Sequence, residues 1–228
     1  MIWQERTGRI EQVPWQADWL SAGEQDVIRS TRSHRGRFAA RLLAKQLLAE
    51  HYRSVDHYNQ IHIESRDGRD RSTRPQAYIS GRLIPWNISL SHSERIVSAA
   101  ILPTCNGRIG LDLVDPAALS VRPLKYWLTF AEAERAMDQL SMGIIWSLKE
   151  AIYKASNEGT PFFPRHVDTA TYLSSTAWSC IDRDVRIQGR ATRSISNGWE
   201  LSLNVVDGTI RTLVWCRPES LRYKDSQS

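Results

Sequence analysis

Long hydrophobic runs and closely spaced cysteines are both missing from this sequence of 228 residues. No stretch approaches the roughly 18 uninterrupted apolar residues that a membrane-spanning helix needs, and the opening residues lack a basic segment followed by an apolar run. The 3 cysteines form no CxxC pair, which excludes the common zinc and dithiol redox motifs. With 12 glycines and 9 prolines, the composition is neither collagen-like nor linker-like. We therefore expect a cytoplasmic protein with reduced thiols and no membrane association.

What the sequence does contain is an ordinary globular composition with an excess of positive charge. Hydrophobic residues make up 41% and charged residues 24%, so the chain can bury a core. Lys and Arg number 30 against 25 Asp and Glu, for a net charge of +5. This balance favours an anionic partner, which could be a nucleic acid, a phosphorylated cofactor or an acidic protein.

The first half of the chain begins with two predicted helices. Ser21 and Glu24 have the capping-box spacing, which predicts a short helix over 17–28. Residues 35–52 carry a wide apolar stripe at helical spacing and predict a longer helix. All charged residues of this second helix before Glu50 are basic. Because the amino end of a helix already carries a partial positive charge, this favours an external anion there. These cations are Arg35, Arg37, Arg41 and Lys45.

Strands follow these helices. Residues 61–64 alternate, whereas the Arg-rich segment 65–76 contains turn residues and is predicted to be a loop. Residues 84–93 and 95–103 predict two strands with a turn between them, and 108–115 begins a new strand. We place a domain boundary near residue 105.

The second half repeats the order of the first. Helical material is expected over 123–158 and a loop over 159–166, and strands are expected at 167–174, 177–181, 183–190, 199–206 and 209–216. Helices followed by antiparallel strands, twice, predict an α+β fold. We expect a pseudo-dimer of two similar lobes, residues 1–105 and 106–228, each with a helix packed on a small antiparallel sheet.

Two carboxylates stand out as candidates for chemistry. Asp112 lies in the otherwise apolar strand IGLDLV, where a carboxylate is costly unless it is paired or binds a metal. Glu150 shares a helix face with Lys154 at i,i+4 spacing, and Lys149 lies beside it. A strand Asp and a helix Glu could hold Mg²⁺ while the lysines face phosphate oxygens. The alternatives are an ordinary Glu150–Lys154 helix ion pair and an Asp112 carboxylate bridged to an arginine.

A third candidate is the segment SLSHS at the end of a predicted strand. There Ser91, His92 and free backbone N–H groups could bind a phosphate, although a histidine in such a segment could equally be an exposed turn residue. A Ser-His-Asp hydrolase is excluded because the sequence has no GxSxG elbow.

Taken in order, these segments resemble the 4′-phosphopantetheinyl transferase family. The segment RIGLDLV, followed 38 positions after Asp112 by Glu150 in WSLKEAIYK, is similar to the paired signature of that family. The Arg-rich segment RGRFAARLLAKQLL and the strand end ISLSHS also resemble family segments. The resemblance covers residues 19 to about 165, and the chain length points to the two-lobed, monomeric type that activates surfactin synthetase.

The resemblance implies an activity and a set of site residues. Family members transfer the 4′-phosphopantetheine arm of coenzyme A to a serine of an apo acyl or peptidyl carrier protein and release adenosine 3′,5′-bisphosphate. Asp112 and Glu150 would hold Mg²⁺, with Mn²⁺ as an alternative, and Glu150 would be the general base, directly or through water. Coenzyme A would be contacted by the residues Arg35, Arg37, Arg82, Ser91, His92, Lys149 and Lys154. Asp112, Glu150 and Lys154 would form the catalytic group.

Two features depart from the family pattern. Many members carry a second acid two residues after the strand aspartate, where this chain has Val114, and the spacing between the two acids is slightly short here. Asp115 is expected to point to the opposite face of the strand and not to replace the missing acid. If a third acid completes the metal site, Glu132 and Glu134 are the candidates.

Two rival functions come from other classes. A basic nucleic-acid-binding module would use the net charge and the arginines at 66, 69, 71 and 74, but the sequence has no recognisable nucleic-acid-binding motif. That module also leaves the two carboxylates without a role. A Mg²⁺-dependent nuclease would need an acid followed by (D/E)xK on one strand, and this order is absent.

Overall fold

The structure, a computed structural model, describes residues 3–29, 34–52, 55–66, 72–119, 126–156 and 161–217. The chain forms two compact units, an N-terminal unit up to Asn106 and a C-terminal unit from Gly107 onward. Each unit combines helices with antiparallel strands, so the predicted α+β class is confirmed. Of the helices in the described ranges, none has the length and apolar character needed to cross a bilayer.

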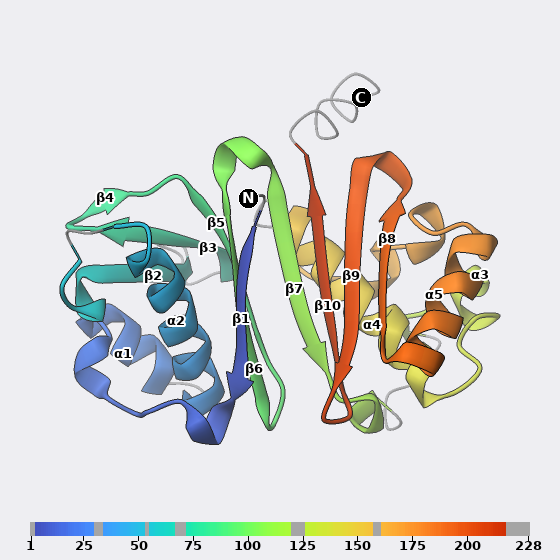
Figure 1. The fold of residues 1–228 in the computed structure, drawn as a ribbon, viewed down its shortest axis with the longest axis horizontal. Coiled ribbons are helices and arrows are strands. Elements are labelled where there is room, and N and C mark those ends of the chain that lie inside the picture. Colours follow the sequence, from blue (N-terminus) through green and yellow to red (C-terminus); the bar gives the residue numbers. More distant parts are fainter. Residues whose placement is uncertain are drawn as a thin grey trace. The chain divides into compact units, whose positions relative to one another are not determined.

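The N-terminal unit contains two three-stranded antiparallel sheets (Figure 1). The first has the order β1-β6-β5, formed by β1 (Gln4–Arg9), β6 (Ile96–Pro103) and β5 (Trp86–His92). The second has the order β2-β3-β4, formed by β2 (Ile61–Arg66), β3 (Ser72–Ile79) and β4 (Arg82–Leu83). Helix α1 (Ala22–Arg29) precedes α2 (His34–Ala49), and α2 packs on β5 and β6.

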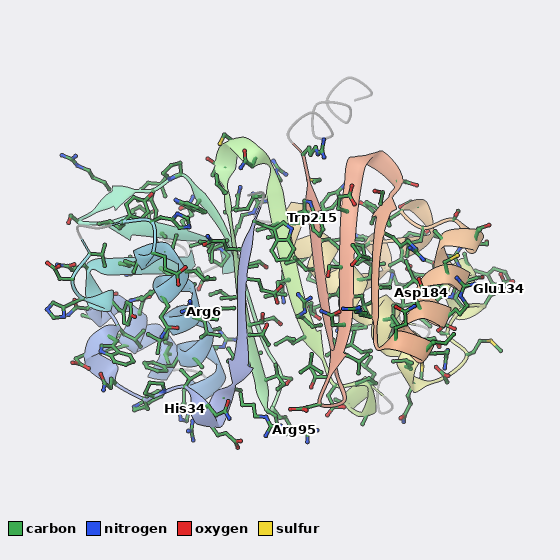
Figure 2. The ribbon with its side chains drawn as sticks, in the orientation of Figure 1. Arg6, His34, Arg95, Glu134, Asp184 and Trp215 are labelled. Atoms are coloured by element: carbon green, nitrogen blue, oxygen red, sulfur yellow. The ribbon has the colours of Figure 1, made fainter. Side chains whose placement is uncertain are left out.

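Helix α2 forms because its apolar stripe is buried against the first sheet. Phe38, Leu42 and Leu48 are all buried in one cluster with Ile88 and Ile101 of the sheet, as the helical spacing predicts. Strand β1 is joined to the far end of the helix through Arg6, which donates to Gln46 Oε1 at 3.0 Å and pairs with Glu50 Oε1 at 2.5 Å (Figure 2).

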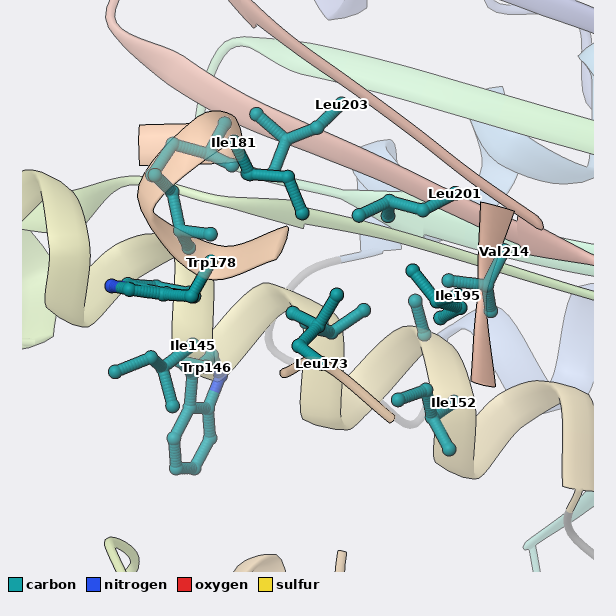
Figure 3. Close-up of a cluster of buried hydrophobic side chains, with 14 of the residues drawn as sticks. Ile145, Trp146, Ile152, Leu173, Trp178, Ile181, Ile195, Leu201, Leu203 and Val214 are labelled. Carbon is teal, nitrogen blue, oxygen red and sulfur yellow. The ribbon is translucent and has the colours of Figure 1, made fainter. Parts of the chain in front are cut away.

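The C-terminal unit is one four-stranded antiparallel sheet with helices on one face (Figure 1). The strand order β7-β10-β9-β8 joins β7 (Arg108–Val114), β10 (Thr209–Cys216), β9 (Trp199–Val206) and β8 (Arg190–Ile195). Helix α4 (Gln139–Ser156) packs on β7 and β10, and α5 (Ser175–Gln188) packs on β8, after the short helix α3 (Phe130–Ala133). Figure 3 shows part of the core between these helices and the sheet, where Ile152 of α4 lies on the side of Val214 of β10; Ile145 of α4 and Leu201 of β9 belong to the same buried cluster.

Short 3-10 turns complete both units. They are η1 (Ile10–Gln12), η2 (Ala17–Trp19), η3 (Tyr58–Gln60) and η4 (Thr104–Asn106) in the first unit, and η5 (Pro116–Leu119), η7 (Pro164–His166), η8 (Thr169–Thr171) and η9 (Ser196–Gly198) in the second.

Several predicted elements are wrong. The two strands expected at 177–181 and 183–190 are one helix, α5, because Trp178, Ile181 and Val185 bury one helical face. Ser174 caps its start by accepting from Ala177 N–H, and Gly189 ends it with φ +66°. The strand expected at 167–174 contains the turn η8 instead.

In the first unit, the predicted loop is too long and one strand was missed. Strand β3 begins at Ser72 inside the expected loop 65–76, and the edge strand β1 was not predicted. The expected helical stretch 123–158 contains two separate helices, α3 and α4, and its residues 123–125 and 157–158 lie outside the described ranges. Strand β3 is stabilised by pairing with β2, and β1 by pairing with β6. The local sequences of β3 and β1 did not predict these strands, because strand formation depends on such partners.

Asp138 at the start of α4 gives a prediction about acid stability. Its Oδ1 accepts from Ser141 N–H at 2.9 Å and its Oδ2 pairs with Arg186 at 2.8 Å. Hydrogen bonding to Arg186 and to the Ser141 backbone lowers the pKa of Asp138 from 3.8 to about 2. The stabilisation is therefore fully present above pH 3.8 and is lost as the pH falls through about 2.

Asp138→Asn should remove this acid-dependent part of the stability. We expect the free energy of unfolding of the variant to fall less steeply than that of the wild type between pH 4 and pH 2, measured by urea denaturation. The difference is small because the Asp138 side chain is 46% exposed. Parallel curves for the two proteins would contradict this assignment.

Candidate active site

Strand β7 carries Asp112 on the face that packs against α4. Gly110, Asp112 and Val114 alternate onto one face of the strand, and Val114 lies in the core cluster with residues of α4. A Cβ atom on Gly110 would stand 1.9 Å from the Ala151 carbonyl oxygen and 2.8 Å from the Ala155 nitrogen. Only glycine therefore lets α4 lie this close to the strand, and the close approach brings the helix side chains to Asp112.

Helix α4 supplies Lys154, which contacts Asp112, and Glu150, which pairs with Lys154. Lys154 Nζ donates to Asp112 Oδ1 at 2.7 Å and to the Leu111 carbonyl oxygen at 3.1 Å, and it lies 3.9 Å from Glu150 Oε2. The Asp112 side chain is 6% exposed, while those of Glu150 and Lys154 are 25% and 26% exposed. The structure thus brings together three of the predicted site residues, with Asp112 at the buried end and the other two partly open. Lys154 is thus one ion-pair partner of Asp112.

The electrostatics of this group hold Lys154 in its charged form. Burial alone would lower the pKa of Lys154, but the carboxylates of Asp112 and Glu150 outweigh it, so the pKa is raised above its ordinary value. Lys154 therefore stays protonated at neutral pH, where it can balance negative charge and cannot accept a proton.

Gly110→Ala should disrupt this arrangement. The added methyl group meets helix backbone, which cannot move without displacing α4, and we expect a loss of about 3 kcal/mol in the free energy of unfolding. Gly143→Ala on α4 is a matched control, because its nearest contact is the flexible end of Ile210 at 2.5 Å and alanine favours the helix. Urea denaturation compares the two variants, and equal losses would contradict the proposed close packing.

Lys149, a predicted coenzyme A contact, is fully buried. Its Nζ pairs with Glu132 Oε2 at 2.7 Å and donates to the carbonyl oxygens of Pro164 and Val167 at 2.9 Å and 2.5 Å. Glu132 also accepts from the Thr169 N–H at 2.8 Å and forms a capping box with Thr129. Burial lowers the pKa of Lys149 in spite of Glu132. This geometry gives Lys149 a structural part in fixing the loop after α4 and leaves it no exposed surface toward a ligand.

The N-terminal unit contains a similar buried ion pair between a capping-box glutamate and a lysine. Glu24 forms a capping box with Ser21, accepts from the Ile63 N–H at 3.1 Å, and pairs with the fully buried Lys45 of α2 at 2.7 Å. Lys45 also donates to the Trp19 carbonyl oxygen at 3.0 Å, and burial lowers its pKa in spite of Glu24. The sequence predicted an external anion near Lys45, but the anion that Lys45 contacts is the Glu24 carboxylate of the same chain.

His92 and Ser91 leave β5 on opposite faces, because side chains alternate along a strand. His92 lies over the first turn of α2, where a Cβ atom on Gly36 would stand 2.7 Å from its Cγ. Ser91 is buried, with 7% exposure. The two residues therefore cannot use their side chains on one ligand from the same side of the sheet.

The predicted arginines lie on two different elements. Arg35 is exposed and Arg37 is half-buried in the first turn of α2, whereas Arg82 is exposed on β4 of the other sheet. Arg41, for which the sequence predicted no specific contact, is 4% exposed and donates to Ser65 Oγ of β2 at 2.6 Å. The sequence feature that could have singled out Arg41 is its spacing of four residues from Arg37, which places both on one helix face.

The remaining acids define what could hold a metal. Glu132 is engaged by Lys149, and Glu134 is exposed near α3. Asp115 accepts from the Ala117 N–H at 3.0 Å at the start of η5, so it caps a turn, and Val114 is buried in the core. No group of three His, Cys, Asp or Glu side chains suited to a metal occurs within the described ranges. The candidate ligand pair is Asp112 and Glu150.

Comparison with known proteins returned no matching family model and no matching curated protein.

Proposed function

We propose that the protein is an enzyme that transfers a phosphorus-linked group from a pyrophosphate to a hydroxyl. The observation that carries this proposal is the group on β7 and α4, where Lys154 lies 2.7 Å from Asp112 Oδ1 and 3.9 Å from Glu150 Oε2. Two carboxylates and a permanent cation at one partly open edge suit the charge and proton movements of such a transfer.

The resemblance of the sequence narrows the proposal to a 4′-phosphopantetheinyl transferase. The donor is then coenzyme A, and the acceptor is a serine of an apo acyl or peptidyl carrier protein. The support is that the two signature segments, although 38 positions apart from Asp112 to Glu150 in the sequence, lie together through the Asp112–Lys154 contact.

The proposed transfer gives Glu150 and Lys154 separate parts in the movement of protons and charge. The serine Oγ attacks the phosphorus that bears the pantetheine arm, a P–O bond forms to the serine, and the P–O bond to the bridging oxygen breaks. The electron pair leaves with adenosine 3′,5′-bisphosphate. Glu150 accepts the serine proton, directly or through water. Lys154 remains an ammonium group and balances charge on the pyrophosphate oxygens.

Asp112 and Glu150 are the residues that would hold Mg²⁺ or Mn²⁺. Carboxylate oxygens are the ligands that these cations prefer, and both side chains already face a common cation in Lys154. When bound, the metal would neutralise the charge of the pyrophosphate. Because Val114 supplies no third carboxylate, water and pyrophosphate oxygens would complete the coordination shell.

The other parts of the proposal follow from the resemblance. Arg35, Arg37, Arg82 and His92 are proposed to contact coenzyme A with their side chains and Ser91 with its backbone, and the protein is proposed to be a cytoplasmic monomer. The two units are proposed to be related lobes. The buried ion pairs Glu24–Lys45 and Glu132–Lys149 support this relation, since each joins a capping-box glutamate to a buried lysine of the longest described helix in its unit.

Intact-mass measurement tests the proposal. The protein is incubated with coenzyme A, Mg²⁺ and a panel of apo-carriers, and a carrier should gain the mass of one phosphopantetheine group. A carrier with its serine replaced by alanine is the control. A folded protein that modifies no carrier would contradict the proposal, and a gel shift with random DNA in its place would favour the nucleic-acid-binding alternative.

A further inference from the structure

A pocket of about 550 Å³ opens on the β2-β3-β4 sheet of the N-terminal unit, within the size range of small-molecule sites. Ile61, Ile63 and Ala77 of these strands point into the core, so the alternating residues His62, Glu64 and Tyr78 point to the outer face and line the pocket. Asn59, Gln60, Ser80 and Gly81 complete its lining.

The hydrogen bonds beneath His62 fix which of its nitrogens carries a proton. Ser21 Oγ lies 2.9 Å from Glu24 Oε2 and 2.6 Å from His62 Nδ1. The single hydroxyl proton goes to the carboxylate, which is the stronger acceptor, so His62 Nδ1–H donates to Ser21. In the neutral ring, Nε2 is then an acceptor.

Glu64 and the aromatic rings give the pocket its remaining character. The His62 and Tyr78 rings lie 6.1 Å apart, and Tyr78 Oη donates to Gln76 Oε1 at 3.0 Å. Burial and the nearby Glu64 carboxylate raise the pKa of Tyr78. Among the described residues that line the pocket, none is a Lys or Arg, although the chain as a whole has a net charge of +5. The pocket therefore combines the Glu64 carboxylate, the His62 imidazole acceptor and the Tyr78 phenol ring.

We propose that this pocket binds a primary alkylammonium group. Such a group has three N–H donors and a positive charge. It would donate to the Glu64 carboxylate and to His62 Nε2, and it would gain a cation–π contact with the Tyr78 ring. A free amine and a lysine side chain of another protein carry the same group, and both fit this chemistry.

An NMR titration of the full chain tests the proposal. The ligands are n-butylammonium, Nα-acetyl-lysine methylamide, and the uncharged 1-butanol. Both amines should produce saturable shifts in the amide signals of Glu64 and Tyr78, and 1-butanol should not. Binding by both identifies the free ammonium group as sufficient, whereas binding by the lysine derivative alone identifies a protein side chain as the source.

Two variants make the test specific. Glu64→Gln keeps the size of the side chain and should weaken amine binding about tenfold or more, because a charge-assisted contact is lost. Glu94→Gln removes an exposed carboxylate of the same unit and should leave binding unchanged. The proposal is overturned by the absence of saturable shifts, by an equal response to 1-butanol, or by undiminished binding in Glu64→Gln.

Discussion

Asp112→Asn and Glu150→Gln are each expected to lower the rate of phosphopantetheine transfer by about 100-fold to 10,000-fold. Glu150→Gln removes the proposed proton acceptor, and general-base catalysis contributes on this order. Asp112→Asn removes the carboxylate that lies 2.7 Å from Lys154 and is proposed to hold the metal. Rates are measured by mass spectrometry of the carrier at saturating coenzyme A and Mg²⁺.

The controls separate chemistry from folding. Asp115→Asn keeps the oxygen that accepts from the Ala117 N–H and should retain wild-type turnover. The double variant Asp112→Asn with Glu150→Gln should lose less than the product of the two single losses, because both residues act on one charge cluster. Near-wild-type turnover in either single variant, with its thermal transition intact, would remove that residue from the site.

The parts of the fold that the sequence predicted are those whose periodic pattern agrees with their burial. Helix α2 is an example, since the stripe through Phe38 and Leu42 is the face that enters the core. Helix α5 shows where the prediction was wrong, because two strands were expected over 177–190. The capping serine Ser174 and the left-handed Gly189 carried the correct signal, and both are local features of the sequence.

Some contacts of the candidate site were likewise predictable from local spacing, and others were not. Glu150 and Lys154 share a helix face by spacing alone, so their proximity was predictable. The contact of Lys154 with Asp112 depends on how α4 lies on β7, and this was available only through resemblance to a family. Lys149 was interpreted as a ligand contact because the sequence gives no sign that Glu132, 17 positions earlier, is buried beside it. Long-range pairing of buried charges has no periodic signature.

Lys149→Met is expected to be the most destabilising substitution of a charged residue in α4. It leaves the fully buried Glu132 carboxylate without its cation, which should cost about 3–5 kcal/mol in the free energy of unfolding. Adding Glu132→Gln should recover part of the loss, because the neutral amide no longer carries a buried charge and its oxygen can still accept from the Thr169 N–H. Urea denaturation of the two variants and the wild type measures both effects.

Arg186→Met is the matched control for this pair. Arg186 forms ion pairs with Asp138 and Asp182 in the same unit, but its side chain is 38% exposed, so its loss should cost no more than about 1 kcal/mol. If Lys149 acts only through the structure, Lys149→Met should also keep the KM for coenzyme A within about twofold at temperatures where it is folded, since a lost ligand contact would change ground-state binding. A small stability loss combined with a large rise in KM would instead assign Lys149 to the ligand, and the buried pair with Glu132 would then not be its main role.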